Sequence, residues 1–313
     1  MTKSPITRRD VMISGGWRSR KNQLANLLLI GIPFVGSILA IDHIVRHGVS
    51  LIDISAFMIF YVLVGLGVAL GFHRYFSHRS FATGTALSAI LAAFGTMAFQ
   101  GSVERWVSDH RRHHAVTDQP GDVHSPIFRS DGQPWTKWRG FVHAHIGWMF
   151  ANSVTDLSIY GKGLADDPIV RFFSQTHILW LIASLGLPYL FGLLLGGEKA
   201  AWSAMLIGGC LRTTILHNVV WAVNSVGHLY GSADFETGDN SRNNLILALL
   251  TFGDGWHNGH HLFPRSHRHG LLPRQWDANA VIITTLERSG LVWNIVGPSA
   301  RNAPDGLPAL EKP

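Results

Sequence analysis

The stretch ISAFMIFYVLVGLGVALGFHRYFSH, residues 54–78, joins an uncharged apolar run directly to two histidines. Its apolar part, residues 54–72, contains no Asp, Glu, Lys or Arg. A helix needs about 20 predominantly apolar residues to cross the hydrocarbon core of a bilayer. We therefore expect a transmembrane helix that carries a polar site at one end.

Three further apolar runs have spanning length, and they cover residues 24–41, 178–197 and 200–223. Only Glu198 and Lys199 separate the last two runs, so these two helices must be antiparallel neighbours. Together the four runs predict an all-α integral membrane protein with four transmembrane helices in two hairpins.

The composition agrees with a membrane protein. Of the 313 residues, 47% are hydrophobic and 15% are charged, against about 25% charged in soluble domains. This apolar content excludes a disordered chain, and the single cysteine, Cys210, excludes disulfide frameworks and cysteine-ligated metal sites. We expect one domain over residues 24–296, between a cytosolic segment, residues 1–23, and a loose Pro-rich tail, residues 297–313.

The distribution of Lys and Arg favours a cytoplasmic position for both termini and for the long middle segment. Six basic residues precede the first apolar run: Lys3, Arg8, Arg9, Arg18, Arg20 and Lys21. Nothing resembles a cleavable signal peptide. We expect a multi-pass protein of a bacterial inner membrane, with its termini and its site on the cytoplasmic side.

Eight of the 18 histidines fall in three short motifs, HRYFSH, HRRHH and HNGHH. They are His73, His78, His110, His113, His114, His257, His260 and His261. In the second and third motifs the spacing i, i+3, i+4 would point three imidazoles of one α-helix into one volume. His73 and His78 would lie about 140° apart on an α-helix, so we expect the helix to end between them.

Neutral imidazoles suit zinc, copper, iron or nickel, and eight of them exceed the four ligands of one closed site. Two metals sharing the histidines is the simplest interpretation. No Glu-x-x-His occurs in the chain, which argues against the carboxylate-rich di-iron bundle of soluble proteins. We expect ordinary surface or core positions for His43, His47, His143, His145, His177 and His217.

A fifth uncharged stretch, residues 82–101, is also long enough to cross the membrane. A crossing there would put His73 and His78 on the opposite side from residues 110–114, so that they could not share a metal. We therefore expect an interfacial or re-entrant helix, with all three motifs at the cytoplasmic boundary.

With their flanks, the motifs resemble the integral-membrane fatty acyl desaturases, specifically the stearoyl-CoA type delta-9 group. The matching stretches are GFHRYFSHRSF, WVSDHRRHH, TDQPGDVHSP, NSVGHLYG and GDGWHNGHHLFPRSHRHGL, between about residues 50 and 295. The resemblance implies four transmembrane helices under a cytosolic helical cap and a di-iron centre held by nine histidines. The ninth histidine would be His228, and Asn224 would hold a water ligand.

The resemblance also implies the reaction. O2 and two electrons would remove two hydrogens from a saturated long-chain acyl-CoA and leave a cis double bond, at delta-9, for unsaturated fatty acid biosynthesis. The electrons would come from a separate protein, either a ferredoxin or a cytochrome b5 type donor with its reductase. Four basic residues beside the motifs could dock an acidic donor: Arg111, Arg112, Arg265 and Arg268.

Further positions are assigned by the same resemblance. Tyr61, Gly65 and Trp106 would line the acyl tunnel, where a small residue such as Gly65 leaves room for a chain of about eighteen carbons. Polar neighbours would orient the ring nitrogens of the metal ligands; the candidates are Asp109, Asp118, Asp122, Asp254 and Asn258.

The sequence departs from the animal enzymes at Gly101 and Ser108, where those enzymes hold the CoA head group with asparagine and arginine. Acyl-lipid and acyl-ACP are therefore alternative substrates, and a membrane di-iron hydroxylase acting on alkyl or acyl chains is the alternative enzyme. A histidine-rich metal transporter should hold its ligands near the membrane midplane. Here the motifs flank the ends of the spans, which disfavours a transporter.

Overall fold

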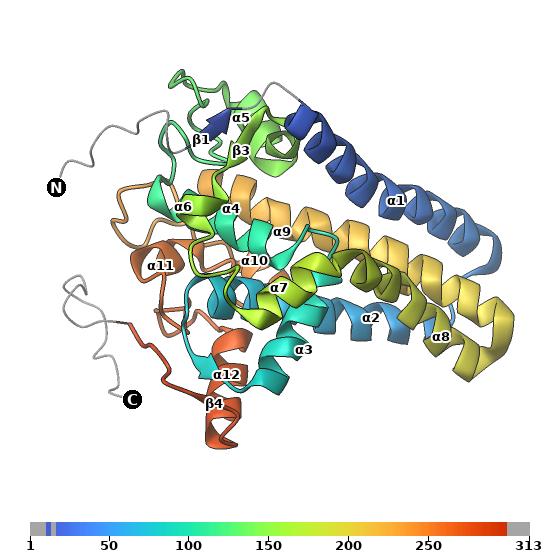
Figure 1. Cartoon of the computed structure of the whole chain (residues 1–313). Helices are drawn as coiled ribbons and strands as arrows, with labels where there is room; N and C mark the ends of the chain where they lie inside the picture. Colours follow the sequence, from blue (N-terminus) through green and yellow to red (C-terminus); the bar gives the residue numbers. More distant parts are fainter. Residues whose placement is uncertain (1–10, 14–16, 299–313) are drawn as a thin grey trace.

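The computed structural model describes residues 11–13 and 17–298 of the chain (Figure 1). The expectations for Lys3, Arg8, Arg9 and for most of the tail lie outside the described residues. Within the described part, the long helices lie side by side with their axes roughly aligned (Figure 1). Shorter helices gather around one end of them (Figure 1).

Three helical segments are long and apolar enough to span a membrane: Ser19–His47, Leu51–Ser77 and His177–Leu229. The first lies in α1 (Trp17–His47). The second joins α2 (Leu51–Leu66) to the π-helix η2 (Gly67–Ser77). The third consists of α8 (His177–Ala204), the π-helix η4 (Met205–Leu211) and α9 (Arg212–Leu229).

The third segment folds back on itself at Gly197. Its φ of 74° and ψ of −166° are not helical, and glycine adopts such angles more readily than other residues. Beyond this point Arg212 Nη2 donates a hydrogen bond of 2.9 Å to Ser184 Oγ. In a straight helix these residues would lie about 42 Å apart. The segment is therefore an antiparallel pair of helices. Its turn at Gly197 adjoins Glu198, where the sequence predicted the turn.

The turn between α1 and α2 is also specified locally. Gly48 has φ of 78°, and Ser50 then caps α2. The Ser50 side chain accepts a hydrogen bond from the Asp53 backbone N–H, and the Asp53 carboxylate accepts one from the Ser50 backbone N–H. This reciprocal pair satisfies two backbone donors that have no partner within the helix.

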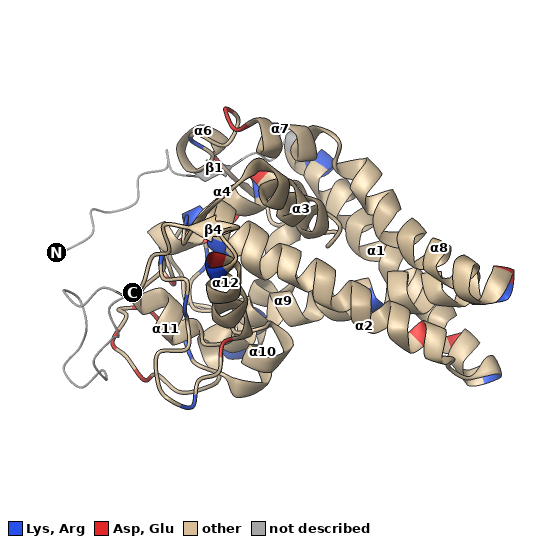
Figure 2. Ribbon diagram, turned by 90° about the horizontal axis from the view of Figure 1, so that it is seen from below, with Lys and Arg blue, Asp and Glu red and all other residues tan. Residues whose placement is uncertain are grey.

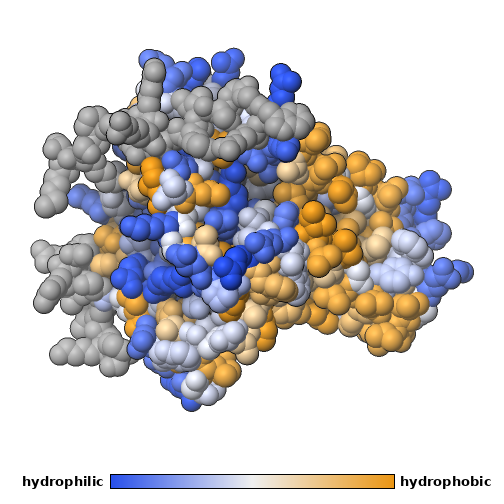
Figure 3. Space-filling view, in the orientation of Figure 1, coloured by the Kyte–Doolittle hydropathy of each residue, from blue (hydrophilic) through white to orange (hydrophobic). Residues whose placement is uncertain are grey.

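The surface of the long helices is apolar over a continuous band, whereas hydrophilic residues cover the end with the short helices (Figure 3). Most of the charged residues lie at this same end (Figure 2). Large exposed apolar side chains of α1 include Leu24, Leu27, Leu28, Ile32, Phe34, Val35, Ile38, Leu39 and Ile41. Soluble proteins rarely expose apolar surface of this extent, and the band is typical of contact with lipid.

The short elements form the polar end of the molecule. Its helices are α3 (Thr85–Thr96), α4 (Val103–Ala115), α5 (Lys137–His145), η3 (Gly147–Phe150), α6 (Leu157–Tyr160), α7 (Pro168–Gln175), α10 (Leu245–Leu250), α11 (His257–Leu262) and α12 (Ala278–Arg288). Two antiparallel strand pairs tie the chain together: β1 (Val11–Ile13) with β3 (Ser153–Thr155), and β2 (Ala82–Thr83) with β4 (Val292–Trp293).

Helix α3 occupies the fifth uncharged stretch of the sequence. Its 12 residues extend only about 18 Å, which is well short of the roughly 30 Å of bilayer hydrocarbon. This length agrees with the expectation that residues 82–101 do not cross the membrane.

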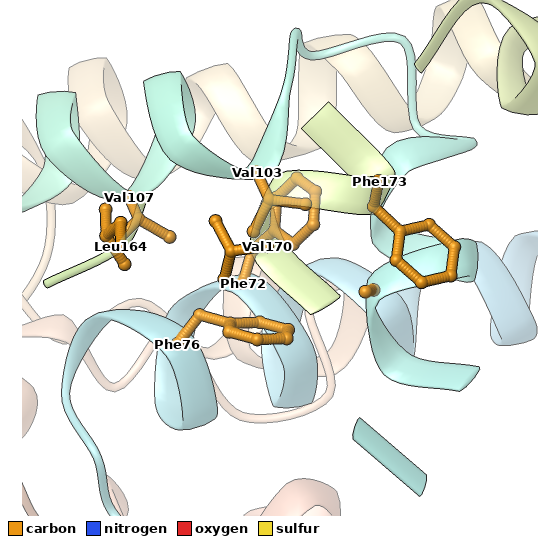
Figure 4. Packing of buried hydrophobic residues seen from close by; sticks show 8 residues of the cluster. Phe72, Phe76, Val103, Val107, Leu164, Val170 and Phe173 are labelled. Atoms are coloured by element: carbon orange, nitrogen blue, oxygen red, sulfur yellow. The ribbon is translucent and has the colours of Figure 1, made fainter. Parts of the chain in front are cut away.

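A buried apolar cluster fixes η2 against α4 (Figure 4). Phe72 and Phe76 of η2 pack against Val103 and Val107 of α4, and α7 covers them with Phe173. Full burial of a Phe side chain contributes roughly 1.5–3 kcal/mol. These contacts hold together the two elements that carry the first two histidine motifs.

Candidate metal centre

Nine histidines from four separate elements meet at the polar end of the long helices. They form two groups, in each of which the possible ligand atoms all lie within 4.8 Å of one another. The five-histidine cluster contains His73, His78, His110, His114 and His260. The four-histidine cluster contains His113, His228, His257 and His261. The structure thus brings together the eight histidines of the motifs and His228.

The first motif reaches the site by a route that the sequence analysis did not anticipate. The helix does not end between His73 and His78, because residues 67–77 wind as a π-helix. The His78 backbone N–H donates to the His73 carbonyl at 3.2 Å, an i to i+5 hydrogen bond. This wider winding places i and i+5 on nearly the same face, and such winding is frequent at functional sites.

The second and third motifs lie on α4 and α11, but their rings do not share one volume as the spacing predicted. In α4, His110 and His114 join the five-histidine cluster, while His113 joins the other. In α11, the middle ring, His260, joins the five-histidine cluster, while the outer pair joins the other. Each of these two motifs therefore contributes to both clusters, whereas both histidines of the first motif belong to the five-histidine cluster.

Four of the nine rings are held by carboxylates through Nδ1. The pairs are His73 with Asp254 (2.9 Å), His113 with Asp122 (2.9 Å), His228 with Asp118 (2.9 Å) and His261 with Asp239 (3.0 Å). A carboxylate is an acceptor, so each of these Nδ1 atoms carries the ring proton. The Nε2 lone pair is then free for a metal, an arrangement common around metal-binding histidines.

The remaining contacts test whether these residues fit a metal. The Nε2 atoms of His228 and His261 both lie 3.0 Å from Nε2 of His257, which can donate at most one proton. Among the described residues, the buried Nε2 of His113 has no hydrogen-bond partner. An unpaired buried acceptor costs about 1–3 kcal/mol. A metal ion bound by these converging lone pairs would resolve both conflicts, so the residues fit one.

Electrostatics favour the neutral form of four rings on α4 and α11. Burial and the neighbouring imidazoles hold the pKa of His110, His114, His257 and His260 well below the usual range of histidine. Burial raises the pKa of Asp122, but the adjacent His113 and His124 more than offset this and keep its carboxyl below its usual pKa. Neutral imidazole is the form that ligates metal.

Two of the five residues expected to orient ring nitrogens have other partners. Asp109 accepts from Arg105 Nε at 2.9 Å and from the Thr155 hydroxyl. Asn258 bonds both backbone groups of Phe235, at 2.7 and 3.1 Å. Within the described residues, neither is hydrogen-bonded to one of the nine rings. The other three, Asp118, Asp122 and Asp254, are in the carboxylate pairs described above.

Three further residues lie at the site without having been predicted from the sequence: Asp239, His124 and His269. Asp239 lies in a polar loop, and the DFETGDN stretch gave no signal that it holds His261. The ring centroid of His124 lies 4.3 Å from that of His113, and the ring of His269 lies 4.3 Å from that of His260. Both histidines stand in the quoted matching stretches, DVHSP and SHRHGL, which was the available signal.

The four basic residues expected to dock an electron donor do not form one continuous exposed surface. Arg112 is buried and donates to the Gly121 carbonyl at 2.6 and 2.8 Å, so it cannot contact a partner protein. Arg111 bonds the carbonyl oxygens of Phe76 and Lys162. Arg265 and Arg268 are exposed.

Two cavities meet at the histidines. A wide cleft is bordered by α1, the start of α4 and α9, and a narrow, mostly apolar cavity runs beside η2 towards Gly65. Trp106, His110 and Asn224 line both cavities. Of the three residues expected to line the acyl tunnel, Gly65 and Trp106 line the narrow cavity, whereas Tyr61 does not. The Tyr61 hydroxyl donates to the Leu250 carbonyl at 2.9 Å. An extended apolar chain could therefore pass from the cleft, beside the clusters, into the narrow cavity.

The six histidines expected to be ordinary contribute to none of the groups found among the described residues. His217 is buried, and its Nε2 lies 3.0 Å from the Ala98 carbonyl oxygen. The rings of His43 and His47 lie beside each other at the far end of α1.

Comparison with known proteins gives a consistent result. A family model described as fatty acid desaturase matches residues 54–290. The hex-5-enoyl-[acyl-carrier protein] acetylenase of Moorena producens is 36% identical over 277 residues, which are 88% of this chain and 86% of that protein. The sn-1 stearoyl-lipid 9-desaturase of Anabaena variabilis is 36% identical over 242 residues (77% and 82%). A probable acyl-CoA desaturase of Schizosaccharomyces pombe is 32% identical over 291 residues (89% and 55%).

Proposed function

The chain belongs to the fatty acid desaturase family and is an oxidoreductase of that family, and we propose that it places a cis double bond, at delta-9, in a saturated long-chain acyl group. The observation that best supports this proposal is the convergence of nine imidazoles beside a narrow apolar cavity. The imidazoles would bind metal, and the cavity would hold an acyl chain.

We propose that the nine histidines hold two iron ions, with Asn224 placing a water ligand. Bound iron, with O2 and two electrons, would supply the oxidising power to remove hydrogen from an unactivated C–H bond. The chain's own residues orient the rings through carboxylates and exclude water from the narrow cavity with Val68, Ala69 and Leu216. We propose iron rather than zinc because the reaction requires a redox-active metal, and zinc is not redox-active.

We propose a membrane arrangement of four spans, formed by α1, by α2 with η2, and by the two arms of residues 177–229. The reversal at Gly197 and the apolar band support this count. The domain would extend over residues 24–296, with the termini and the clusters on the cytoplasmic side of a bacterial inner membrane. The charge on the polar end supports that orientation.

We propose acyl-CoA as the carrier of the acyl group. The flanks of the third histidine motif and the fungal relative support this choice. Two other relatives are named for substrates on a lipid and on acyl-carrier protein, so these two carriers are the alternatives. The electrons would come from a separate ferredoxin or cytochrome b5 type donor.

Expression of the full chain in a desaturase-deficient host tests the reaction. We expect a new cis monoene among the fatty acid methyl esters, absent from a His260→Ala variant and retained in a His47→Ala variant. His47 is exposed at the far end of α1 and serves as the matched control. A hydroxy acid in place of the monoene would favour the alternative, a membrane hydroxylase.

A further inference from the structure

We infer that Phe252, on the turn after α10, is the floor of the acyl cavity and sets the chain length that the enzyme accepts. This inference rests on the proposed function, because it concerns the substrate of the same site. From the sequence, Tyr61 and Gly65 were expected to line the tunnel and the small Gly65 to leave room for a long chain, and Phe252 had no predicted role.

The ring of Phe252 occupies the space in front of Gly65. A Cβ atom built on Gly65 would lie 2.6 Å from Phe252 Cε2, closer than real Cβ contacts. The absence of a side chain at Gly65 therefore does not lengthen the cavity. This differs from the expectation that a small residue there leaves room for a longer chain. Gly65 instead admits the Phe252 ring, which fills that volume.

The ring is supported from below and from the sides. Its centroid lies 6.0 Å from that of Tyr61, and it packs in the apolar cluster that contains Val64, Val68 and Leu216. Gly65, Val68, Leu216 and Phe252 all line the narrow cavity. A terminal methyl group entering from the histidine end would therefore meet Phe252 before it could reach Tyr61.

The backbone at Phe252 is held in place. Its φ of 58° lies in the left-handed region, which bulky residues rarely adopt. The Phe252 carbonyl accepts from the Asn279 backbone N–H at 2.9 Å, and the Gly253 N–H donates to the Ala248 carbonyl at 2.8 Å. The turn therefore presents the ring in one direction.

The same turn connects the floor to the proposed metal centre. Asp254, two residues after Phe252, holds Nδ1 of His73. On the opposite wall, Gly65 of α2 precedes His73 of η2 by eight residues. Both walls thus fix the distance between the reacting carbons and the floor, and this distance determines how many carbons can extend beyond the new double bond.

The test compares Phe252→Ala with wild type in the same host, fed a mixture of saturated acids of fourteen to twenty carbons. We expect the ratio of longer to shorter monoenes to rise about tenfold or more, since one methylene in a fitted pocket discriminates by roughly 10–200-fold. Leu249→Ala is the matched control, because Leu249 is 56% exposed on α10 and outside the cavity lining. An unchanged ratio in Phe252→Ala would overturn the inference.

A pair of substitutions separates Phe252 from Gly65. Gly65→Ile should push the ring into the cavity and favour shorter products. In Gly65→Ile combined with Phe252→Ala, the new side chain should take the vacated volume and restore products towards wild-type length. Equal shortening in both backgrounds would assign chain length to Gly65 alone and contradict our inference. If Phe252→Ala does not accumulate, Phe252→Leu provides a smaller change of the same sign.

A binding measurement keeps this test independent of turnover. The thermal unfolding midpoint of the purified full chain is measured without O2 in the presence of saturated fatty acids of increasing length, because ligands stabilise the state that binds them. The length that stabilises most should increase in Phe252→Ala. If wild type made no monoene, the proposed function would fail, while this length dependence would still decide the role of Phe252.

Discussion

The two histidine clusters use the same ligand type but differ in what lies behind the rings. In the four-histidine cluster, carboxylates hold three rings, those of His113, His228 and His261. In the five-histidine cluster, among the described residues, a carboxylate holds only His73, and that carboxylate, Asp254, also binds the buried guanidinium of Arg74 at 3.0 Å.

Burial differs in the same direction. All four rings of the smaller cluster are buried, whereas His110 and His114 of the larger one are partly exposed. A cation in the smaller cluster would therefore be balanced by three nearby negative charges and shielded from water. The comparison predicts that the four-histidine cluster would bind metal more tightly and that the five-histidine cluster would be the more accessible one.

Removal of a ligand should have the largest effect in either cluster. We expect His257→Ala, in the four-histidine cluster, and His260→Ala, in the five-histidine cluster, to reduce monoene formation to background. Each should lower the metal content from two ions per chain to about one, measured by elemental analysis. Loss of both ions from either variant would show that the clusters do not bind independently.

Loss of the buried carboxylate behind His113 should have an intermediate effect. Asp122→Asn removes the charge behind His113 and should weaken metal binding by about 10–100-fold, measured by competition with a chelator. Asp109→Asn is the control, since Asp109 pairs with Arg105 and Thr155 instead of a ring. Equal weakening in both variants would argue against a specific role for the pairing.

The smallest effect is expected at Asp239. Its side chain is 9% exposed, whereas that of Asp122 is fully buried, so water can replace part of its interaction with His261. We expect Asp239→Asn to weaken metal binding by about tenfold or less, near the lower end of the range for such partners. An effect exceeding that of Asp122→Asn would reverse the proposed ranking by burial.

The sequence predicted the parts of the fold that depend on local pattern. Apolar length identified the long helices, and the motifs identified eight of the nine clustered histidines, because both signals lie in consecutive residues. The resemblance supplied His228, which is a single histidine in a helix and has no spacing of its own.

Other features depend on contacts that sequence spacing cannot express. The π-helical winding at His73 follows from a hydrogen-bond register, and the motif alone was compatible with a helix end. Asp239 meets His261 from a loop 22 residues away, and Phe252 fills the space at Gly65 from across the cavity. In each case the sequence contains the partner residue but does not show that it lies next to the site in the folded protein.

Anaerobic titration of the metal-free full chain with ferrous iron tests the central claim most directly. We predict two equivalents bound in two steps, the first tighter, with the tight step lost in His257→Ala and the weaker step lost in His260→Ala. Saturation at one equivalent, or loss of the same step in both variants, would contradict the assignment of two iron sites to the two histidine clusters.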